Sequence, residues 1–356
     1  MVGARSNMPA PQLGGRAMGV LDRAVANQSL AAIVVADGEP SVLGTMSLVV
    51  EGGTSQGRDA SRNDNRRAVL DGIAAARADD PEADVLTGLD LAARSIRSVE
   101  TLPHEIAVID SGLSTVAPLD FTQPGLLEAD PQEVADTLQR IGALPDLEGM
   151  DVTFQGLGDT AAPQEPLGIA QRDNLAAIWE AVIEAAGGEM EVEHAPLEGD
   201  SPSDGGRAAL PEVRIVPIPD GPACSGPTVE LTGSDVAFLP DSAEFANPAA
   251  ARAILEPIAK QLVETGATAT LTGTTADVGP IEGQRARGLS RAQAVLDELV
   301  ELGVPRESLT AFGLGSEYSE YVPDHDADGN LLPGPAAENR KVIITLDNGA
   351  TWTLCE

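Results

Sequence analysis

The sequence has few lysines and few aromatic residues. Lys260 and Lys341 are its only lysines, and Phe, Trp and Tyr make up 3% of its 356 residues. Ala, Val, Leu and Ile must therefore form the cores, and a hydrophobic fraction of 42% fits globular packing. The formal net charge is -34. Nucleic acids and anionic lipid headgroups would meet a field of their own sign, so the charge argues against proteins that bind either.

The sequence also has no long hydrophobic run. No stretch of 18 apolar residues occurs, so we expect no membrane-spanning segment in this chain. The start, Met1–Pro9, is polar and lacks the charged-then-apolar pattern of a signal peptide. We therefore expect a chain that followed an N-terminal anchor, with the native anchor itself absent from this sequence.

Catalytic signatures are missing as well. There is no nucleophile and base pair, Gly-rich phosphate loop or close carboxylate pair, and Gly156–Asp159 is too short for a dinucleotide fingerprint. His104, His194 and His325 have no neighbours in sequence that would complete a catalytic or zinc-binding set. The sequence thus favours a protein that is not an enzyme.

Proline and glycine divide the chain. The length allows two domains, each with its own core. Breaker residues are dense near residue 200, and we predict a linker over 198–222. Val213–Val216 is the one stretch there that suits an added strand. The predicted order is an N-terminal arm (1–27), a first domain (28–197), the linker and a second domain (223–356).

The first domain alternates apolar runs with amphipathic stretches. Continuous apolar runs are typical of strands buried on both faces, so the pattern predicts an α/β domain with a mostly parallel sheet and helices on both faces. The expected strands are 30–36, 46–50, 105–109, 150–154 and 190–192, and the expected helices are 83–96, 131–141 and 171–186.

Polar residues gather where these strands end, which is where α/β sheets bind ligands. Asp37 and Ser41 follow the first strand, Thr87 opens a helix, and Asp110 follows a later strand. This set resembles the von Willebrand factor A domain, which implies a divalent ion, with Glu39 replacing the middle serine of its motif. Oxygen ligands of this kind suit Mg²⁺. The alternative is that Asp37 and Asp110 only cap the turns or helices that follow them.

The second domain carries the most informative pattern. Thr272–Gly279 reads Thr-Gly-Thr-Thr-Ala-Asp-Val-Gly, and it is followed by Arg291–Val295, Gly313–Gly315 and Asn339–Val342. The order and spacing resemble the OmpA-like peptidoglycan-associated domain. The resemblance implies an α+β fold of βαβαββ type that contacts the cell wall without catalysis.

The resemblance also implies a ligand site. In the family, an Asp and an Arg fifteen residues later hold the diaminopimelate unit of peptidoglycan, through its ammonium and its carboxylate. Arg291 matches the Arg, whereas Ala276 stands in place of the Asp. We predict that Asp277, Arg340 and Asn339 complete the site. The alternatives are a surface salt bridge for Arg291 and a strand-edge ion pair for Arg340.

Two further features belong to this domain. Asp324, Asp326 and Asp328, followed by Gly329, resemble the start of a calcium loop, although position 12 would be Pro335. The alternative is a solvated acidic turn. The only cofactor that we expect is an Mg²⁺ or Ca²⁺ ion.

The two cysteines, Cys224 and Cys355, flank the OmpA-like region. We predict a disulfide between them, as expected outside the cytosol, rather than two free buried thiols. In the chain-entropy model a loop of this length would contribute about 4–5 kcal/mol.

Together these features predict a non-catalytic, extracytoplasmic protein of the cell envelope. The OmpA-like domain would contact peptidoglycan, and the first domain would recruit a protein partner. The rival hypothesis is a structural or assembly module that binds protein, its peptidoglycan site having decayed at Ala276.

Overall fold

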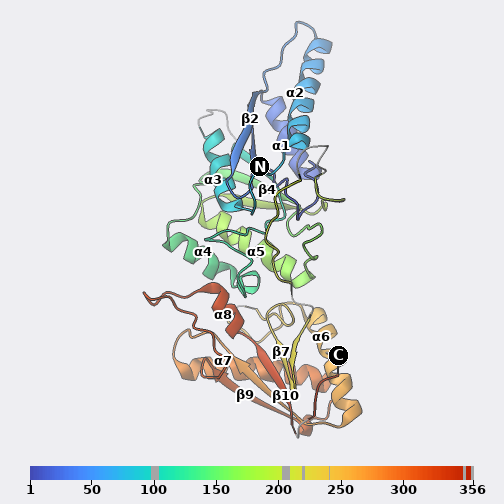
Figure 1. Cartoon of the computed structure of the whole chain (residues 1–356), viewed down its shortest axis with the longest axis vertical. Helices are drawn as coiled ribbons and strands as arrows, with labels where there is room; N and C mark the ends of the chain where they lie inside the picture. The colour runs from blue at the N-terminus through green and yellow to red at the C-terminus, as the bar shows by residue number, and fades with distance from the viewer. Residues whose placement is uncertain (98–103, 203–208, 219–220, 240, 348–349, 354–356) are drawn as a thin grey trace. The chain divides into compact units, whose positions relative to one another are not determined.

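The computed structural model describes residues 1–356 except 98–103, 203–208, 219–220, 240, 348–349 and 354–356. The chain forms two compact units (Figure 1). The first contains Met1–Gln123 and Val134–Ile218, and the second contains Pro124–Glu133 and Pro219–Glu356. No helix among the described residues has the length and apolar character needed to cross a membrane.

The first unit is built on a sheet whose strands run mainly parallel. Its strands are β1 (Leu30–Val35), β2 (Ser41–Ser47), β3 (His104–Ile109), β4 (Met150–Gln155) and β5 (Glu189–Glu193). β3, β4 and β5 pair in parallel, while β2 pairs antiparallel with β1. Val2 joins the two groups, because it bridges Val35 of β1 and Ile109 of β3 in parallel. The predicted parallel sheet is therefore present, with β2 as an antiparallel edge.

Helices cover both faces of this sheet. They are α1 (Gly15–Ala26), α2 (Ser55–Ala75), α3 (Val85–Ile96), α4 (Pro131–Arg140) and α5 (Ile169–Ala185). Leu21 of α1 and Ile73 of α2 share a buried apolar cluster with Val35. Gly88 of α3 lies against Ala36, the residue that follows β1. Because successive residues of an extended chain point to opposite faces, Ala36 faces the side of the sheet opposite to Val35. The helices predicted at 83–96, 131–141 and 171–186 are thus confirmed as α3, α4 and α5.

The predicted N-terminal arm is wrong. Met1, Val2, Ala4 and Met8 are buried, and α1 packs on the sheet through its own buried face. The segment was predicted as an arm because its first nine residues are mostly small or polar, whereas the structure inserts it between two strands. The first unit therefore begins at residue 1 and not at residue 28.

The linker prediction also needs correction. Val213 and Val216 are buried, and the Gln164 side chain exchanges two hydrogen bonds with the Val216 backbone, at 2.8 and 2.9 Å. This stretch forms no strand, contrary to the candidate strand at Val213–Val216. Its described residues belong to the first unit as far as Ile218, because buried valines tie extended chain to the domain surface.

The second unit is a five-stranded sheet with two long helices. The strands are β6 (Ala223–Ser225), β7 (Thr228–Leu231), β8 (Ala269–Thr274), β9 (Leu309–Gly315) and β10 (Val342–Leu346), in the order β6-β7-β10-β8-β9. The helices are α6 (Pro248–Thr265), α7 (Ile281–Glu301) and α8 (Pro333–Asn339), with short 3₁₀ turns η1 (Leu126–Glu128) and η2 (Arg306–Ser308). Relative to the expected βαβαββ order, β6 and α8 are additions.

Apolar residues of the sheet and the long helices form one core in the second unit. Leu255 of α6, Leu296 of α7 and Ile344 of β10 are fully buried in it. Asn247 caps the start of α6, where its side chain accepts a hydrogen bond from the Ala250 amide at 3.1 Å. Gly266 ends the helix in the left-handed conformation (φ 63°). This scaffold positions the loops that carry the candidate site.

Candidate functional site

Three glycines bring α7 unusually close to the sheet. A Cβ atom on Gly273 of β8 would lie 1.9 Å from the Gly288 carbonyl oxygen of α7, and one on Gly313 of β9 would lie 2.0 Å from the Arg285 carbonyl oxygen. Gly288 is equally constrained from the helix side. Only glycine fits these close approaches. They fix the height of α7 above β8 and β9, and Arg291 lies one turn further along the same helix.

The Arg291 guanidinium is half-buried and stacks on an aromatic ring. Its central carbon lies 5.3 Å from the centre of the Phe238 ring, and its Nε donates to the Ser242 carbonyl at 3.3 Å. Among the described residues no carboxylate forms an ion pair with it. The described residues therefore do not form the surface salt bridge that was the alternative for Arg291, and a ring and a backbone carbonyl hold the side chain.

The electrostatic surroundings of Arg291 are positive. Burial, together with the nearby positive charges of Arg340 and Arg287, lowers the pKa of Arg291 to about 10, against a smaller opposite effect of the Asp241 carboxylate. Arg287 is itself paired with Asp241 at 3.0 Å. A buried cation without a counter-ion is unfavourable, so an anion bound here would gain both a charge partner and a hydrogen-bond acceptor.

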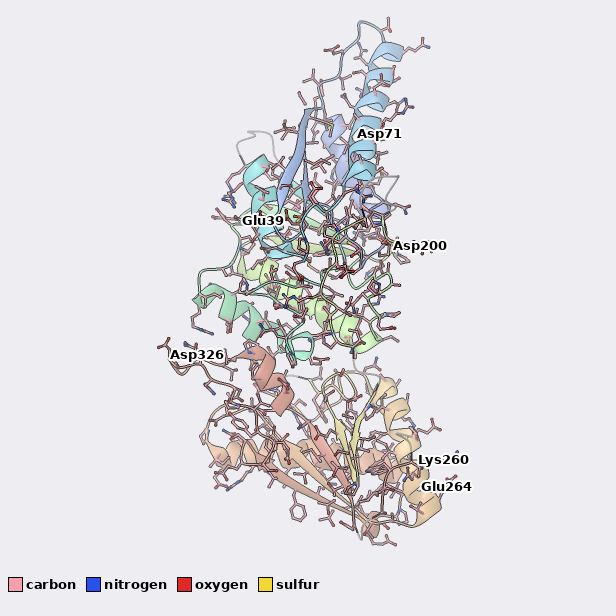
Figure 2. The ribbon with its side chains drawn as sticks, in the orientation of Figure 1. Glu39, Asp71, Asp200, Lys260, Glu264 and Asp326 are labelled. Atoms are coloured by element: carbon pink, nitrogen blue, oxygen red, sulfur yellow. The ribbon has the colours of Figure 1, made fainter. Side chains whose placement is uncertain are left out.

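Arg340 was predicted as a second contact to the ligand. Its guanidinium instead forms a two-pronged pair with Glu133, with N to O distances of 2.5 and 2.9 Å. The predicted alternative of an ion pair is thus what the structure shows, although Arg340 also contributes positive charge near Arg291. Lys341 pairs with Glu230 at 2.6 Å, and Lys260 lies near Glu264 on the exposed side of α6 (Figure 2).

Asp277 and Asn339 lie next to Asp324, which was predicted as a calcium ligand and not as part of the peptidoglycan site. Asp324 is fully buried, and its Oδ2 accepts hydrogen bonds from the Asp277 amide (2.9 Å) and the Asn339 Nδ2 (3.1 Å). Its Oδ1 accepts from the Tyr321 hydroxyl (2.5 Å) and contacts His325 Nδ1 (2.9 Å). Asp324 therefore ties the insertion between β9 and β10 to the loop after β8.

The side chains of Asp277 and Asn339 are also occupied. Asp277 Oδ1 accepts from the Gln284 Nε2 at 2.7 Å, and Asn339 Oδ1 accepts from the Tyr318 hydroxyl at 2.6 Å. Asn339 Nδ2 donates to the Val322 carbonyl at 2.7 Å. Of the four predicted peptidoglycan-binding residues, Asn339 has a structural role, and Asp277 is engaged at the start of α7.

Hydrogen bonding keeps Asp324 ionised although it is buried. Burial alone would raise its pKa, but the hydrogen bonds from Tyr321, the Asp277 amide and Asn339 outweigh that effect and hold the pKa below its usual value. The same environment raises the pKa of Tyr321 to about 12, mainly through burial and through its bond to Asp324. The hydroxyl is therefore a stable donor at neutral pH.

The predicted calcium loop is not formed. Asp324 points into the protein, whereas Asp326 accepts hydrogen bonds from the Asp328 amide (2.9 Å) and the Asn330 amide (2.8 Å) of its own turn. Within the described chain, no three acidic, histidine or cysteine side chains converge as metal ligands. Asx-type hydrogen bonding of Asp326 closes the turn, which is the alternative that the sequence allowed.

The predicted divalent-ion site of the first unit is replaced by an ion pair. The Arg5 guanidinium, fully buried, pairs with both oxygens of Asp110 at 2.7 and 2.8 Å. Asp37 accepts hydrogen bonds from the Asp79 and Asp80 amides, at 2.9 and 3.1 Å. Arg5 supplies the positive charge that Mg²⁺ would supply, so this donor set does not fit the ion.

The other two predicted ligands support the same correction. Ser41 and Thr87 are exposed, and the Thr87 amide donates to the Asp84 side chain at the start of α3. Asp37 acts as a cap for neighbouring backbone, as the alternative proposed. The sequence analysis missed Arg5 because its partner Asp110 lies 105 residues away.

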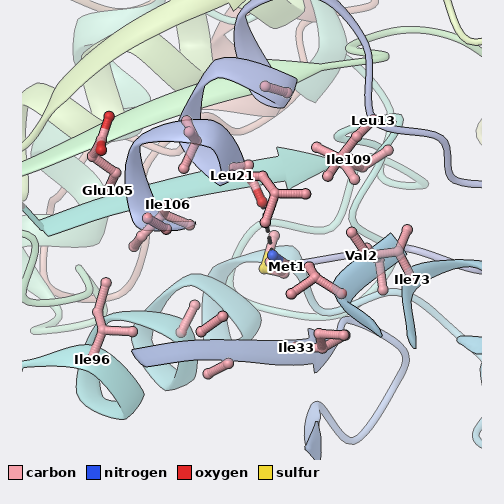
Figure 3. Close-up of a pocket in the computed structure, with 18 of the residues that line it drawn as sticks. Met1, Val2, Leu13, Leu21, Ile33, Ile73, Ile96, Glu105, Ile106 and Ile109 are labelled. Carbon is pink, nitrogen blue, oxygen red and sulfur yellow. Dashed lines mark hydrogen bonds between the residues drawn. The ribbon is translucent and has the colours of Figure 1, made fainter. Parts of the chain in front are cut away.

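The first unit also contains an apolar cavity of about 120 Å³, beside the point where Val2 joins β1 and β3 (Figure 3). Leu21, Ile33 and Ile106 are among its aliphatic lining residues. Met1 lies among the lining residues in the middle of Figure 3, and its amino group donates to the Ala107 carbonyl at 2.7 Å. The lining offers no set of polar groups that would orient a substrate.

The predicted disulfide stays a prediction. Cys224 lies in β6 and packs against the core of the second unit, while Cys355 falls outside the described residues.

Residues that matter at the site were missed by sequence reasoning. Phe238, Arg287 and Tyr321 all lie outside the motif segments. One signal was present, since the only two tyrosines of the chain, Tyr318 and Tyr321, fall in the insertion before Asn339. Their rings pack edge to face at 6.0 Å. Two aromatic residues so close together in an aromatic-poor chain indicate a small core of their own.

Comparison with known proteins identifies part of the second unit. A sequence profile of the OmpA family matches residues 237–328. Among solved structures, the chain is similar to the peptidoglycan-associated lipoprotein from Burkholderia pseudomallei, with 25% identity and a TM-score of 0.27 over 33% of this chain and 89% of that one. It is also similar to the periplasmic domain of Helicobacter pylori MotB, with 18% identity and a TM-score of 0.29 over 37% of this chain and 79% of that one.

A third similar structure is the cell wall anchor of the T6SS from Pseudomonas aeruginosa, with 22% identity and a TM-score of 0.27 over 33% of this chain and 79% of that one. A search of curated proteins found no match. The resemblance of the first unit to a von Willebrand factor A domain finds no support in these comparisons. Residues 237–328 are an OmpA family domain.

Proposed function

We propose that this protein is a non-catalytic component of the cell envelope whose OmpA family domain binds the peptide part of peptidoglycan. The observation that carries the proposal is the guanidinium of Arg291, half-buried against Phe238 and without an ion pair in the described part of the chain. Arg291 also occupies the position at which the family holds a ligand carboxylate. A diaminopimelate carboxylate would supply the missing anion through a charge-assisted, two-pronged bond.

The other half of the family site is altered in this chain. Ala276 is buried at the position of the family Asp and offers no group for the ligand ammonium. Asp277 is exposed beside it, with one carboxylate oxygen bound to Gln284. We propose that Asp277 attracts the ammonium with its remaining oxygen and that the acidic surface adds a weak, salt-sensitive contribution.

The first unit is proposed to mediate contacts with protein. The residues predicted to hold an ion there are engaged otherwise, Asp110 by Arg5 and Asp37 by the Asp79 and Asp80 amides, so we assign the unit neither a metal nor a reaction. We place the whole protein outside the cytoplasm, on the cell-wall side of the membrane, because that is where the proposed ligand is found.

The direct test is co-sedimentation of the full chain with insoluble peptidoglycan. Wild type should appear in the pellet, and Arg291→Gln should remove most of the bound fraction because the carboxylate loses its partner. Arg285→Gln is the matched control, since Arg285 lies on the same helix but is paired with two carboxylates, Glu282 at 3.2 Å and Glu317 at 2.5 Å. Equal pelleting of both variants would contradict the assignment of Arg291.

A second candidate function follows from Ala276. If the loss of the family Asp abolished glycan binding, the OmpA family domain would serve as a structural or assembly module that binds protein. Ala276→Asp separates the two functions. Binding by wild type that strengthens in Ala276→Asp supports the peptidoglycan proposal. Binding by Ala276→Asp alone would show that the wild-type site has decayed and would favour the assembly module.

A further inference from the structure

A short segment from the first half of the sequence is part of the second unit. The chain belongs to the first unit as far as Gln123, to the second unit over Pro124–Glu133, and to the first unit again from Val134 to Ile218. In sequence the segment lies far ahead of the OmpA family match at residues 237–328. The segment is therefore an addition to the domain that carries Arg291.

The segment fits closely on α8. A Cβ atom on Gly125, which has a φ of 73°, would lie 2.3 Å from the Gly334 carbonyl oxygen and 2.9 Å from the Glu338 Cγ. A Cβ atom on Gly334 would lie 2.8 Å from the Pro124 carbonyl oxygen. Glycine on both sides allows the two backbones to approach. Leu127 of η1 is buried in the same region, so the segment has a specific seat on this unit.

The segment ends at the ion pair of Glu133 and Arg340. The two guanidinium nitrogens lie 2.5 and 2.9 Å from the two carboxylate oxygens, which is the geometry in which a guanidinium holds the carboxylate of a ligand. The Arg340 and Glu133 side chains are 23% and 25% exposed, so a ligand can reach the pair. Arg340 also lies close enough to Arg291 for its charge to lower the Arg291 pKa. Glu133 thus occupies a second guanidinium beside the proposed carboxylate site.

The seat of the segment gathers like charges. The carboxylate of Glu128 in η1 lies near the carboxylates of Asp235 and Glu338. Burial and, to a smaller extent, these two negative charges raise the pKa of Glu128, against hydrogen bonds from its own backbone and from Ser234. Burial also raises the pKa of Asp235 and of Glu338. Carboxylates held together repel one another, so the charges around Glu128 oppose docking of the segment and the Glu133 pair favours it.

We infer that residues Pro124–Glu133 form an autoinhibitory latch, in which the Glu133 carboxylate masks Arg340 from a carboxylate of the bound peptide. The inference rests on the proposed function of Arg291. With the latch closed, the ligand has one guanidinium to bind and meets the negative charge of Glu133. With the latch open, Arg291 and Arg340 both face the ligand. An anion that takes Arg340 from Glu133 also removes the main attraction that holds the latch, so ligand binding and latch closure oppose each other.

The test is fluorescence anisotropy of a labelled peptide fragment that contains diaminopimelate, titrated with the full chain. Glu133→Gln removes the competing carboxylate and should raise the affinity about three- to tenfold. Gly125→Ala leaves the charge unchanged but places a Cβ atom against the Gly334 carbonyl, and it should raise the affinity by a similar factor. Adding Arg340→Gln to Glu133→Gln should return the affinity to that of wild type, because the gain comes from the released guanidinium.

Two matched controls should leave the affinity unchanged. Glu298→Gln removes the same charge from a different ion pair of this unit, since Glu298 lies 2.6 Å from Arg252. Gly142→Ala imposes a similar left-handed strain, because Gly142 has a φ of 69°, but a Cβ atom there meets open space. Circular dichroism of every variant shows whether the fold persists.

Hydrogen exchange of wild type measures the reciprocal effect. A saturating concentration of the fragment should speed the exchange of the Glu128 and Ala129 amides, which bond within the latch. Binding that appears only in Glu133→Gln and Gly125→Ala would also support the latch. Binding by wild type that requires Arg291 and is unchanged in both latch variants would overturn the latch and leave the proposed function intact. Absence of binding by wild type and by every variant would overturn both.

Discussion

At the scale of single residues, Arg291 contacts an aromatic face and one backbone carbonyl, and no carboxylate of the described residues forms an ion pair with it, unlike an ordinary surface arginine. Burial lowers its pKa to about 10, so the guanidinium is protonated at neutral pH and loses its proton as the pH rises through that value. Binding of a ligand depends on this proton only if the Arg291 guanidinium binds an anion. The pH dependence of binding therefore includes the titration of this side chain, and a substitution that moves its pKa separates it from the titration of the ligand ammonium.

We predict that affinity for peptidoglycan fragments is constant between about pH 7 and pH 9 and falls above the Arg291 pKa. Arg291→Lys should move the fall to lower pH, because lysine has a lower ordinary pKa and the same burial disfavours its charged form. Fluorescence anisotropy of a labelled fragment measures both profiles, with circular dichroism to check folding. Superimposable profiles would argue that another cation binds the ligand.

A local motif in the sequence marks single residues, whereas a partner far along the chain is not marked. Arg291 was predicted from its spacing within a known pattern and stays a predicted site residue. That no described carboxylate forms an ion pair with it is visible only in three dimensions. Arg5 was not considered, because nothing near it in sequence marks it as buried. Its pairing with Asp110 arises when the N-terminal segment enters the sheet between β1 and β3.

At the scale of elements, the insertion between β9 and β10 is held by Asp324. Its carboxylate receives hydrogen bonds from Tyr321, Asn339 and the Asp277 amide while it is buried. Removing such a group leaves several buried donors without an acceptor, which costs more than the bonds themselves contribute. The insertion and the loop after β8 are thus expected to depend on each other.

We predict that Asp324→Ala lowers the free energy of unfolding by about 2–3 kcal/mol. Asp328→Ala should change it by less than about 0.5 kcal/mol, because Asp328 is exposed at the tip of the same turn. Chemical denaturation followed by circular dichroism measures both. Similar losses in the two variants, or a loss in both that calcium reverses, would favour an ion site over the hydrogen-bonded role given to Asp324.

The helix α3 was predicted from its apolar pattern, and α2, which lacks one, was missed. The apolar run 46–50 was predicted as a strand, whereas β2 spans Ser41–Ser47. α3 buries six of its twelve residues, and its bounds agree closely with the predicted helix. α2 buries only Val69 and Ile73 along twenty-one residues, so it shows little apolar periodicity. α1 was overlooked because it lies within the segment assigned to an arm. A helix that buries one face has apolar residues at helical spacing, and this spacing is what allows a helix to be predicted from sequence.

At the scale of the whole molecule, the sequence predicted two units but placed their limits differently. The first unit takes in both the predicted arm and the described part of the predicted linker, through Met8 at one end and Val216 at the other. The second unit also includes Pro124–Glu133, which no sequence pattern indicated. Contacts between distant segments decide such limits, and a single sequence does not display them.

The central claim for the whole protein is that Arg291 holds a carboxylate of the peptidoglycan peptide. The most direct test is isothermal titration calorimetry with two matched fragments, one with a free diaminopimelate carboxylate and one with that carboxylate amidated. Each is titrated into wild type and Arg291→Gln. The four affinities form a double-mutant cycle, which isolates the bond between the guanidinium and the carboxylate from every other contact.

Wild type should bind the free acid about 30- to 100-fold more tightly than the amide, the equivalent of about 2–3 kcal/mol for a charge-assisted bond. Arg291→Gln should bind both fragments with the same, weaker affinity. If amidation weakened binding to Arg291→Gln as much as to wild type, the carboxylate would be bound by another residue and the account of this site would be contradicted.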